Sequence, residues 1–161
     1  MSYHTASPVV ERFVAMSADS LRFGLIGAGR IGIVHAGSIN DTKGAELTWV
    51  CDPFVENAQK LGTQYGAKVS ADPMEVINSG EIDAILIASP TPTHVDLLNA
   101  GIDAGVHIMC EKPIDLDINR VEALRDKANS AKVNISLGFN RRFHPQFETI
   151  NRRVKAGEIG N

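Results

Sequence analysis

The chain has 161 residues, which allow one domain with a hydrophobic core and exclude two full-sized domains. Hydrophobic residues make up 43% of the chain and charged residues 22%, as in an ordinary globular protein. A net charge of −3 offers no positive surface to nucleic acid or to an anionic membrane, and no apolar run is long enough to cross a bilayer. We therefore expect neither nucleic acid nor a membrane among its partners.

Residues 1–20 show no sustained hydrophobic period. Glu11, Arg12 and Asp19 interrupt the segment, so it lacks the continuous apolar core of a secretory signal. We expect a flexible leader that stays outside the fold, because ends of this composition are rarely tied down by packing.

A glycine-rich motif, Gly27-x-Gly29-x-x-Gly32, follows the first predicted strand and opens a helical segment over residues 31–39. In such a motif the first glycine permits a tight turn, the second lets the backbone approach a pyrophosphate, and the third lets the helix pack closely on the sheet. The start of the helix presents free N–H groups and a positive dipole end to the phosphates. The motif predicts a dinucleotide site, and a purely structural turn is the alternative.

Asp52 ends the second predicted strand, about twenty residues after the glycines, as a ribose-binding acid would. Its carboxylate can accept both ribose hydroxyls of adenosine and would repel a 2′-phosphate, which favours NAD over NADP. The same residue, followed by Pro53, is also typical of a helix N-cap. Arg30 could reach a phosphate or stack on adenine.

Strand-like and helix-like segments alternate from Leu21 onward. The strands are continuous apolar runs, as expected when a parallel sheet is covered on both faces. Repeated βα units with right-handed crossovers predict an α/β fold with a doubly wound parallel sheet, of strand order 3-2-1-4-5-6. The predicted strands are Arg22–Ile26, Leu47–Cys51, Lys68–Ser70, Ala84–Ala88, His107–Cys110 and Asn134–Leu137.

Several helix boundaries are also legible. Asp72-Pro73 is typical of an N-cap followed by the first helical residue. Thr93 and Asp96 fit a short capping box at the start of the next helix. Gly66 and Gly105 stand where helices should end.

The two cysteines, Cys51 and Cys110, each end a predicted strand. Neither has a second cysteine or a histidine at metal-binding spacing, so we expect no metal site. Buried free thiols in a reducing compartment are the simplest interpretation, which predicts a cytoplasmic protein.

Polar residues collect where the predicted strands end, and ligands of doubly wound sheets bind beyond those carboxyl ends. Strand four is followed by a segment that two prolines make rigid, with hydroxyls and N–H groups for a pyrophosphate or a ribose. His94 at its end has either a local structural contact or a ligand contact. The segment consists of Ser89, Pro90, Thr91, Pro92, Thr93 and His94.

Lys112 follows the fifth strand and precedes a proline, at the mouth of the predicted cleft. A lysine there can donate a hydrogen bond to a substrate hydroxyl or carbonyl oxygen. Glu111 can pair with this lysine or accept from the cofactor, and a surface ion pair is the alternative for both. Arg141 and Arg142, beyond the sixth strand, can hold substrate, cofactor or the carboxylates of a neighbouring domain.

Together these motifs resemble the N-terminal half of the glucose–fructose oxidoreductase / inositol dehydrogenase / rhizopine catabolism family (Gfo/Idh/MocA), and within it the myo-inositol 2-dehydrogenases. The segments that carry the likeness are the glycine motif, Asp52-Pro53, residues 89–94, Glu111-Lys112-Pro113 and residues 138–143. The resemblance covers about residues 21–161. It implies NAD(P)-dependent oxidation of a sugar or cyclitol hydroxyl to a ketone, with Lys112 as the active-site lysine.

The resemblance also implies the residues that contact the cofactor and a domain plan. Residues 21–143 would form the dinucleotide-binding domain, and residues 144–161 an amphipathic helix toward a second α/β domain that carries the substrate wall, an acid–base pair and the surface for homo-oligomers. That domain would lie beyond this chain. The implied cofactor residues are Gly27, Gly29, Arg30, Ile31, Gly32, Asp52, Ser89, Pro90, Thr91, Thr93, His94, Glu111, Lys112 and Arg141.

Two other functions remain compatible with the sequence. One is a stand-alone NAD-binding module that senses redox state or regulates a partner. The other is a domain whose glycine loop binds a phosphorylated ligand other than a dinucleotide. The first interpretation predicts that the chain binds NAD but turns over slowly or not at all by itself, because hydride transfer also needs a positioned substrate and a base.

Overall fold

The computed structural model describes residues 20–158 and 160, so the predicted leader lies outside the described residues except for Ser20. Six parallel strands form one sheet in the order β3-β2-β1-β4-β5-β6, which confirms the predicted doubly wound α/β fold. Each strand lies within two residues of its prediction. The strands are β1 (Leu21–Ile26), β2 (Ala45–Cys51), β3 (Lys68–Ser70), β4 (Ala84–Ile87), β5 (His107–Cys110) and β6 (Ile135–Leu137).

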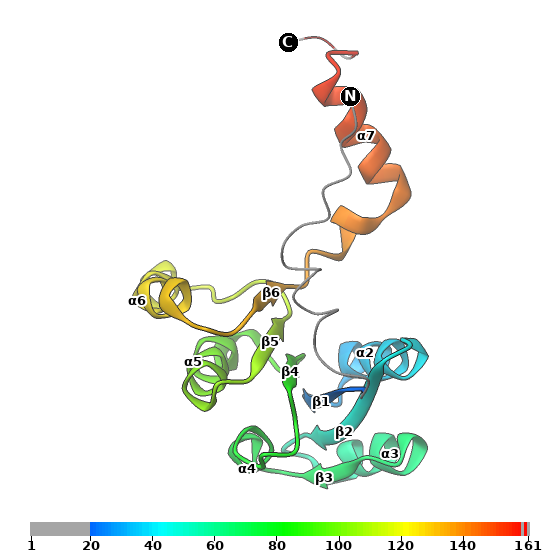
Figure 1. The fold of residues 1–161 in the computed structure, drawn as a ribbon, viewed down its shortest axis with the longest axis vertical. Coiled ribbons are helices and arrows are strands. Elements are labelled where there is room, and N and C mark those ends of the chain that lie inside the picture. Colours follow the sequence, from blue (N-terminus) through cyan, green and yellow to red (C-terminus); the bar gives the residue numbers. More distant parts are fainter. Residues whose placement is uncertain (1–19, 159, 161) are drawn as a thin grey trace.

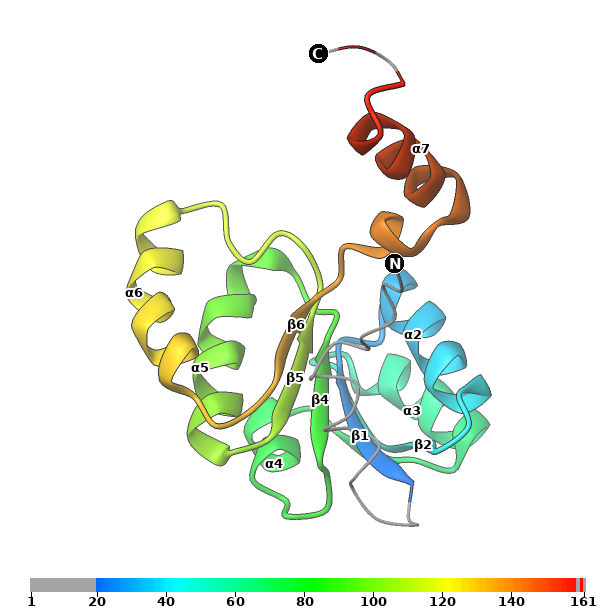
Figure 2. The ribbon, with the colours of Figure 1, turned by 45° about the horizontal axis from the view of Figure 1, so that its top comes forward.

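Helices cover both faces of the sheet (Figures 1 and 2). On one face lie α2 (Arg30–Asp41) and α3 (Val55–Tyr65). On the other lie α4 (Pro73–Ile77), α5 (His94–Ala104) and α6 (Ile118–Ser130). Two short 3-10 turns, η1 (Thr91–Thr93) and η2 (Asn140–Phe143), precede α5 and the last helix, α7 (Pro145–Lys155).

The strands separate two hydrophobic cores because successive side chains point to opposite faces. Leu25 and Val50 belong to the core beneath α2 and α3. Their neighbours Ile26 and Cys51 belong to the core beneath α4, α5 and α6. Both cores are built from apolar strand residues, which explains why the strands read as unbroken apolar runs.

Local residues fix several helix ends as predicted. The Asp72 carboxylate accepts a hydrogen bond from the Met74 N–H at 2.8 Å, with Pro73 as the first helical residue of α4. Gly66 and Gly105 end α3 and α5 with φ of 72° and 73°, a left-handed conformation that favours glycine. These ends direct the chain back into the sheet and so place the loops that follow each strand.

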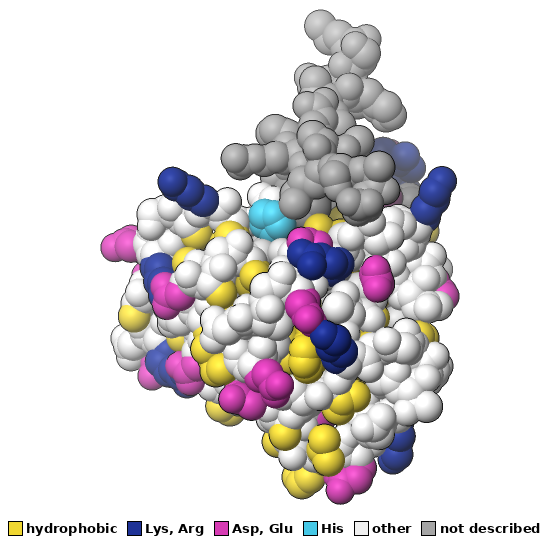
Figure 3. Space-filling view, turned by 60° about the horizontal axis from the view of Figure 1, so that its bottom comes forward, with side chains coloured by type: hydrophobic (Ala, Val, Ile, Leu, Met, Phe, Trp, Pro, Cys, Tyr) yellow, Lys and Arg dark blue, Asp and Glu magenta, His cyan; other side chains and the backbone are white. Residues whose placement is uncertain are grey.

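The described surface carries charges of both signs. On the face shown in Figure 3, lysine and arginine side chains lie among aspartate and glutamate side chains. In the part of the chain that the structure describes, no helix is both long and apolar enough to cross a membrane.

The last helix stands apart from the sheet. In Figures 1 and 2, α7 projects beyond the carboxyl edge of the strands. Phe147, Ile150 and Val154 lie on α7 with exposed fractions of 42%, 54% and 45%. Among residues 20–158 and 160 these side chains are only partly covered: the Arg141 guanidinium lies over the Phe147 ring, and His144 contacts the same ring.

Candidate functional site

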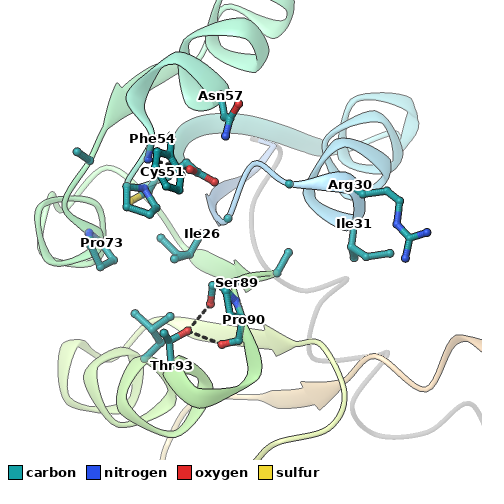
Figure 4. A pocket seen from close by; sticks show the side chains of 17 residues that line it. Ile26, Arg30, Ile31, Cys51, Phe54, Asn57, Pro73, Ser89, Pro90 and Thr93 are labelled. Carbon is teal, nitrogen blue, oxygen red and sulfur yellow. Dashed lines mark hydrogen bonds between the residues drawn. The ribbon is translucent and has the colours of Figure 1, made fainter.

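A cavity of about 700 Å³ lies where β1, β2 and β4 end (Figure 4). This is the point at which the strand order reverses, where ligands of doubly wound sheets bind. The structure brings together here eight of the residues predicted from the sequence: Gly27, Gly29, Arg30, Ile31, Asp52, Ser89, Pro90 and Thr93.

Other lining residues were not predicted from the sequence. Phe54 and Pro73 line the cavity at the side of β2 and β3, with Asn57 nearby (Figure 4). Phe54 is 69% exposed, which is unusual for a large apolar side chain that follows a buried strand. A large apolar residue two positions after Asp52 is the feature of the sequence that could have identified Phe54 as a lining residue.

The three glycines of the motif meet three different requirements. Gly27 has φ of 103°, and a Cβ there would lie 2.7 Å from the backbone of Ala88 and Ser89. A Cβ on Gly32 would collide with the Gly27 carbonyl oxygen, so only glycine lets α2 pack this closely on the turn. A Cβ on Gly29 would meet nothing within 4 Å and would project into open space. That space beside the loop suits a phosphate group.

The start of α2 is free to bind an anion. Gly29 is its N-cap and provides no side-chain hydrogen bond, and the first turn carries no acidic residue. The first N–H groups of a helix have no partner within the helix, and the dipole gives this end a partial positive charge. The loop and the helix start therefore fit the pyrophosphate of a dinucleotide.

Asp52 is 8% exposed and holds the turn around it. Its Oδ2 accepts a hydrogen bond from the Ala28 N–H at 2.8 Å, and its Oδ1 accepts one from the Phe54 N–H at 2.9 Å. The predicted N-cap role is wrong, because the N-cap of α3 is Phe54 and no side chain caps it; the bond from the Phe54 N–H closes a turn ahead of the helix. Each carboxylate oxygen has a second lone pair, so the same group can still accept ribose hydroxyls.

The loop after β4 is ordered by its own hydroxyls. Thr93 Oγ1 lies 2.6 Å from Ser89 Oγ and donates to the Pro90 carbonyl at 2.8 Å (Figure 4). The predicted capping box at Thr93 is wrong, because this side chain caps no N–H of α5. The preceding turn, η1, runs directly into α5, and the hydroxyl is used within that turn. Thr91 does not line the cavity.

His94 does not line the cavity, and its predicted cofactor contact stays a prediction. It is 1% exposed, and each ring nitrogen already has a backbone partner. Nδ1 lies 2.8 Å from the Pro113 carbonyl oxygen, and Nε2 lies 2.9 Å from the Ser89 carbonyl oxygen. Of the two roles left open by the sequence, the structure favours the local one.

Lys112 lines a second, smaller cavity of about 270 Å³ between the ends of β5 and β6. Within residues 20–158 and 160 its side chain makes no hydrogen bond or ion pair, and its peptide bond to Pro113 is cis. Arg141 and Arg142 line the same cavity. The lysine therefore presents an uncommitted ammonium group at the carboxyl edge of the sheet.

Glu111 pairs with a histidine rather than with the side chain of Lys112. Its Oε1 lies 2.9 Å from His35 Nε2, and its Oε2 accepts from the Lys112 N–H at 3.2 Å. His35 belongs to α2 and was not predicted as a site residue. A lone histidine in a short helix gives no sign of a partner 76 residues away.

Both cysteines are buried and free. Burial raises the pKa of the Cys51 and Cys110 thiols from the ordinary 9.0 to about 12, with the charges of Asp52 and Glu111 as smaller causes. The described residues contain no group of three metal-binding side chains. The thiols are therefore unreactive core groups, although Cys51 borders the larger cavity.

The parallel sheet, the glycine turn, the free helix start and the acid at the end of β2 define the class as a dinucleotide-binding Rossmann domain. Residues 21–139 match the Gfo/Idh/MocA family, an oxidoreductase family with an NAD-binding Rossmann fold, and the chain belongs to this family.

Relatives with this domain include inositol dehydrogenases. The chain is 42% identical to inositol 2-dehydrogenase of Rhizobium meliloti over 88% of its own length and 42% of that protein. A myo-inositol dehydrogenase structure from Corynebacterium glutamicum matches with 49% identity and a TM-score of 0.78, over 88% of this chain and 43% of the other. A scyllo-inositol dehydrogenase from Lactobacillus casei, with bound NAD(H) and scyllo-inositol, matches with 29% identity and a TM-score of 0.81, over 89% and 43%. The chain thus spans less than half the length of these relatives.

Proposed function

We propose that the chain is the cofactor-binding part of an NAD-dependent dehydrogenase that oxidises a secondary hydroxyl of a cyclitol or sugar to a ketone. The carrying observation is the cavity that joins the glycine loop, the free start of α2 and Asp52 at the switch point of the sheet. Similarity to inositol dehydrogenases supports the substrate class. The free cysteines support a reducing compartment, the cytoplasm.

In this proposal each part of the larger cavity holds one part of the cofactor. The start of α2 binds the pyrophosphate, and the Asp52 carboxylate accepts hydrogen bonds from the adenosine ribose. Phe54 and Pro73 flank the adenine. Arg30 lies across the cavity from them, with its guanidinium directed outward, which favours a phosphate over adenine as its partner (Figure 4). The carboxylate disfavours the 2′-phosphate of NADP.

Lys112 is the catalytic residue of the proposal. Its Nζ donates a hydrogen bond to the oxygen of the reacting hydroxyl, and its charge stabilises the negative charge that develops there as the proton leaves. Bound NAD supplies the acceptor for the hydride. Glu111 and Arg141 stand beside this lysine and help to hold the nicotinamide end, with Glu111 fixing the Lys112 backbone.

The exposed apolar residues of α7 support the proposed domain plan and disfavour a stand-alone NAD-binding module. Phe147, Ile150 and Val154 are about half exposed. Exposure of apolar side chains to water costs free energy, and packing against another domain would remove that cost. We propose that residues 144–161 lead toward a substrate-binding and oligomerisation domain. The chain alone then binds NAD without efficient turnover, because Lys112 is the one described group that we assign to the reacting hydroxyl.

A titration followed by an activity assay tests this proposal. We expect NADH to bind with a rise in its fluorescence and NAD to displace it, whereas NADP displaces it only at a concentration about tenfold higher or more. With NAD and myo-inositol, absorbance at 340 nm should stay at the level of the buffer. Failure to bind NADH would contradict the cofactor assignment, and sustained turnover would contradict the need for a further domain.

A further inference from the structure

Two histidines contact the loop that carries Lys112, one from each side. His35 comes from α2, the helix that begins at the glycine loop, and His94 comes from α5, the helix that follows the loop after β4. Neither lines the larger cavity, yet each helix begins beside residues that do. The two contacts therefore connect Lys112 to both loops of the cofactor site.

The contact from α2 acts through Glu111. His35 Nε2 lies 2.9 Å from Glu111 Oε1, and the two side chains are only 15% and 16% exposed. The other carboxylate oxygen, Oε2, accepts from the Lys112 N–H. Gly138 closes the far side, because a Cβ there would lie 3.0 Å from the Glu111 carboxyl carbon. The carboxylate is thus held between these groups, and its bond to the Lys112 N–H orients the Lys112 backbone.

The contact from α5 acts through Pro113. His94 reaches the Pro113 carbonyl with Nδ1 and the Ser89 carbonyl with Nε2. Both partners are carbonyl acceptors, so the ring donates an N–H to at least one of them and is held between the two. Because Pro113 follows Lys112 directly, this contact fixes the backbone beside the lysine.

We propose that His35 and His94 are positioning residues that hold Lys112 in register with the cofactor cavity, the first through Glu111 and the second through Pro113. The inference rests on the proposed role of Lys112 at the nicotinamide end. Burial of His94 and pairing of His35 keep both rings away from substrate, so neither acts as the acid or base of the reaction.

The test for His35 measures how NAD protects Lys112 from trace acetylation, read by mass spectrometry. At an NAD concentration about ten times the Kd, roughly nine sites in ten are occupied. We therefore expect NAD to slow the labelling of Lys112 about fivefold or more and to leave the labelling rate of the exposed Lys60 on α3 unchanged. His35→Gln keeps a donor for Glu111 and should keep the protection. His35→Leu removes the donor and should lose it, with the NAD Kd changed by less than about threefold.

His107→Gln is the matched control, since His107 lies at the opposite end of β5, where its Nδ1 accepts from the Asn134 N–H. It should retain protection of Lys112. Protection that survives in His35→Leu would overturn the role of His35. If wild-type protein binds NAD without protecting Lys112, the proposed function is at fault, because the lysine then does not face the cofactor.

A second measurement is made on the wild-type chain and uses a variant only to assign a signal. In the ¹H–¹⁵N spectrum of the histidine rings, an N–H proton of His94 should exchange slowly with water, because it donates to a carbonyl group at a site that is 1% exposed. The signal is assigned by its loss in His94→Gln. Exchange as fast as that of an exposed histidine would overturn the contact from α5, whatever the outcome for NAD binding.

Discussion

The carboxyl edge of the sheet has two regions of different character. Around β1, β2 and β4 several polar side chains already have partners: Asp52 accepts two backbone N–H bonds, and the Ser89 and Thr93 hydroxyls pair with each other. Around β5, β6 and α7, Lys112 and Arg141 are exposed, and so are the apolar residues of α7. The described residues thus hold the side chains of the first region in place, whereas in the second region Lys112 has no hydrogen bond or ion pair among them and the apolar side chains of α7 are only partly covered. The predictions below probe this difference.

The largest effect is expected in the glycine turn. Gly32→Ala places a methyl group against the Gly27 carbonyl, and we expect a loss of about 3 kcal/mol in the free energy of unfolding. Gly29→Ala adds the same methyl group where nothing lies within 4 Å, so stability should change by less than about 0.5 kcal/mol, while NAD affinity falls. Urea unfolding and NAD titration of the pair measure both. Equal stability of the two variants would refute the packing account.

A smaller effect, on NAD affinity, is expected at Asp52, the residue that we assign to the adenosine ribose. Asp52→Asn keeps one acceptor oxygen for the neighbouring N–H groups but loses the charge and half of the acceptor capacity. We expect NAD to bind about tenfold more weakly and the preference over NADP to narrow, since a charged hydrogen bond contributes about 1.5–3 kcal/mol. Calorimetric titration with both cofactors measures this. An unchanged ratio of the two affinities would remove Asp52 from the ribose site.

The two buried thiols should be inert in the native protein. With a pKa of about 12, roughly one thiol in 10⁴ is ionised at pH 8, so a thiol reagent should label neither cysteine until urea is added. The raised pKa also sets a direction for stability. Unfolded thiols lose their protons near pH 9.0 while the folded ones keep them, so the free energy of unfolding should fall as pH rises above 9.0. Rapid labelling without urea would contradict the burial.

The smallest effect is expected in α7. Ile150 is 54% exposed, so Ile150→Glu should change the free energy of unfolding by less than about 0.5 kcal/mol. The matched comparison is Leu25→Ala, which opens a cavity at a fully buried site and should cost about 3 kcal/mol. Urea unfolding of both variants tests whether α7 is uncovered. A large loss in Ile150→Glu would mean that α7 is packed in solution.

The sequence was sufficient for those features that depend on local spacing. The glycine motif, the acid at Asp52 and the Asp72 cap follow from residues close together in the chain, and the apolar runs predict the strand order through the βα rule. The sequence also predicts that the polar residues after the strands lie along one edge of the sheet, because all the strands are parallel. These features need no knowledge of which side chain meets which.

Contacts between distant segments could not be predicted in this way. The pairing of His35 with Glu111 depends on the packing of α2 beside the end of β5, and no local pattern encodes it. Thr93 fitted a capping box, but its hydroxyl donates to the Pro90 carbonyl in the turn before α5 and so caps no N–H of that helix. His94 fitted a ligand contact, but burial turned both ring nitrogens to carbonyl groups. In each case tertiary packing selected among roles that the residue type allows.

Thermal unfolding of this chain with NAD or NADP tests the central claim, an NAD site built by the described residues, most directly. A ligand at a hundred times its Kd adds about 2.7 kcal/mol to the free energy of unfolding, which raises Tm by roughly 5–10 °C in a domain of this size. We predict that shift with NAD, a smaller one with NADP at the same concentration, and none with myo-inositol alone. No shift with either nucleotide would contradict the account, because the cavity at β1, β2 and β4 would then not be a dinucleotide site.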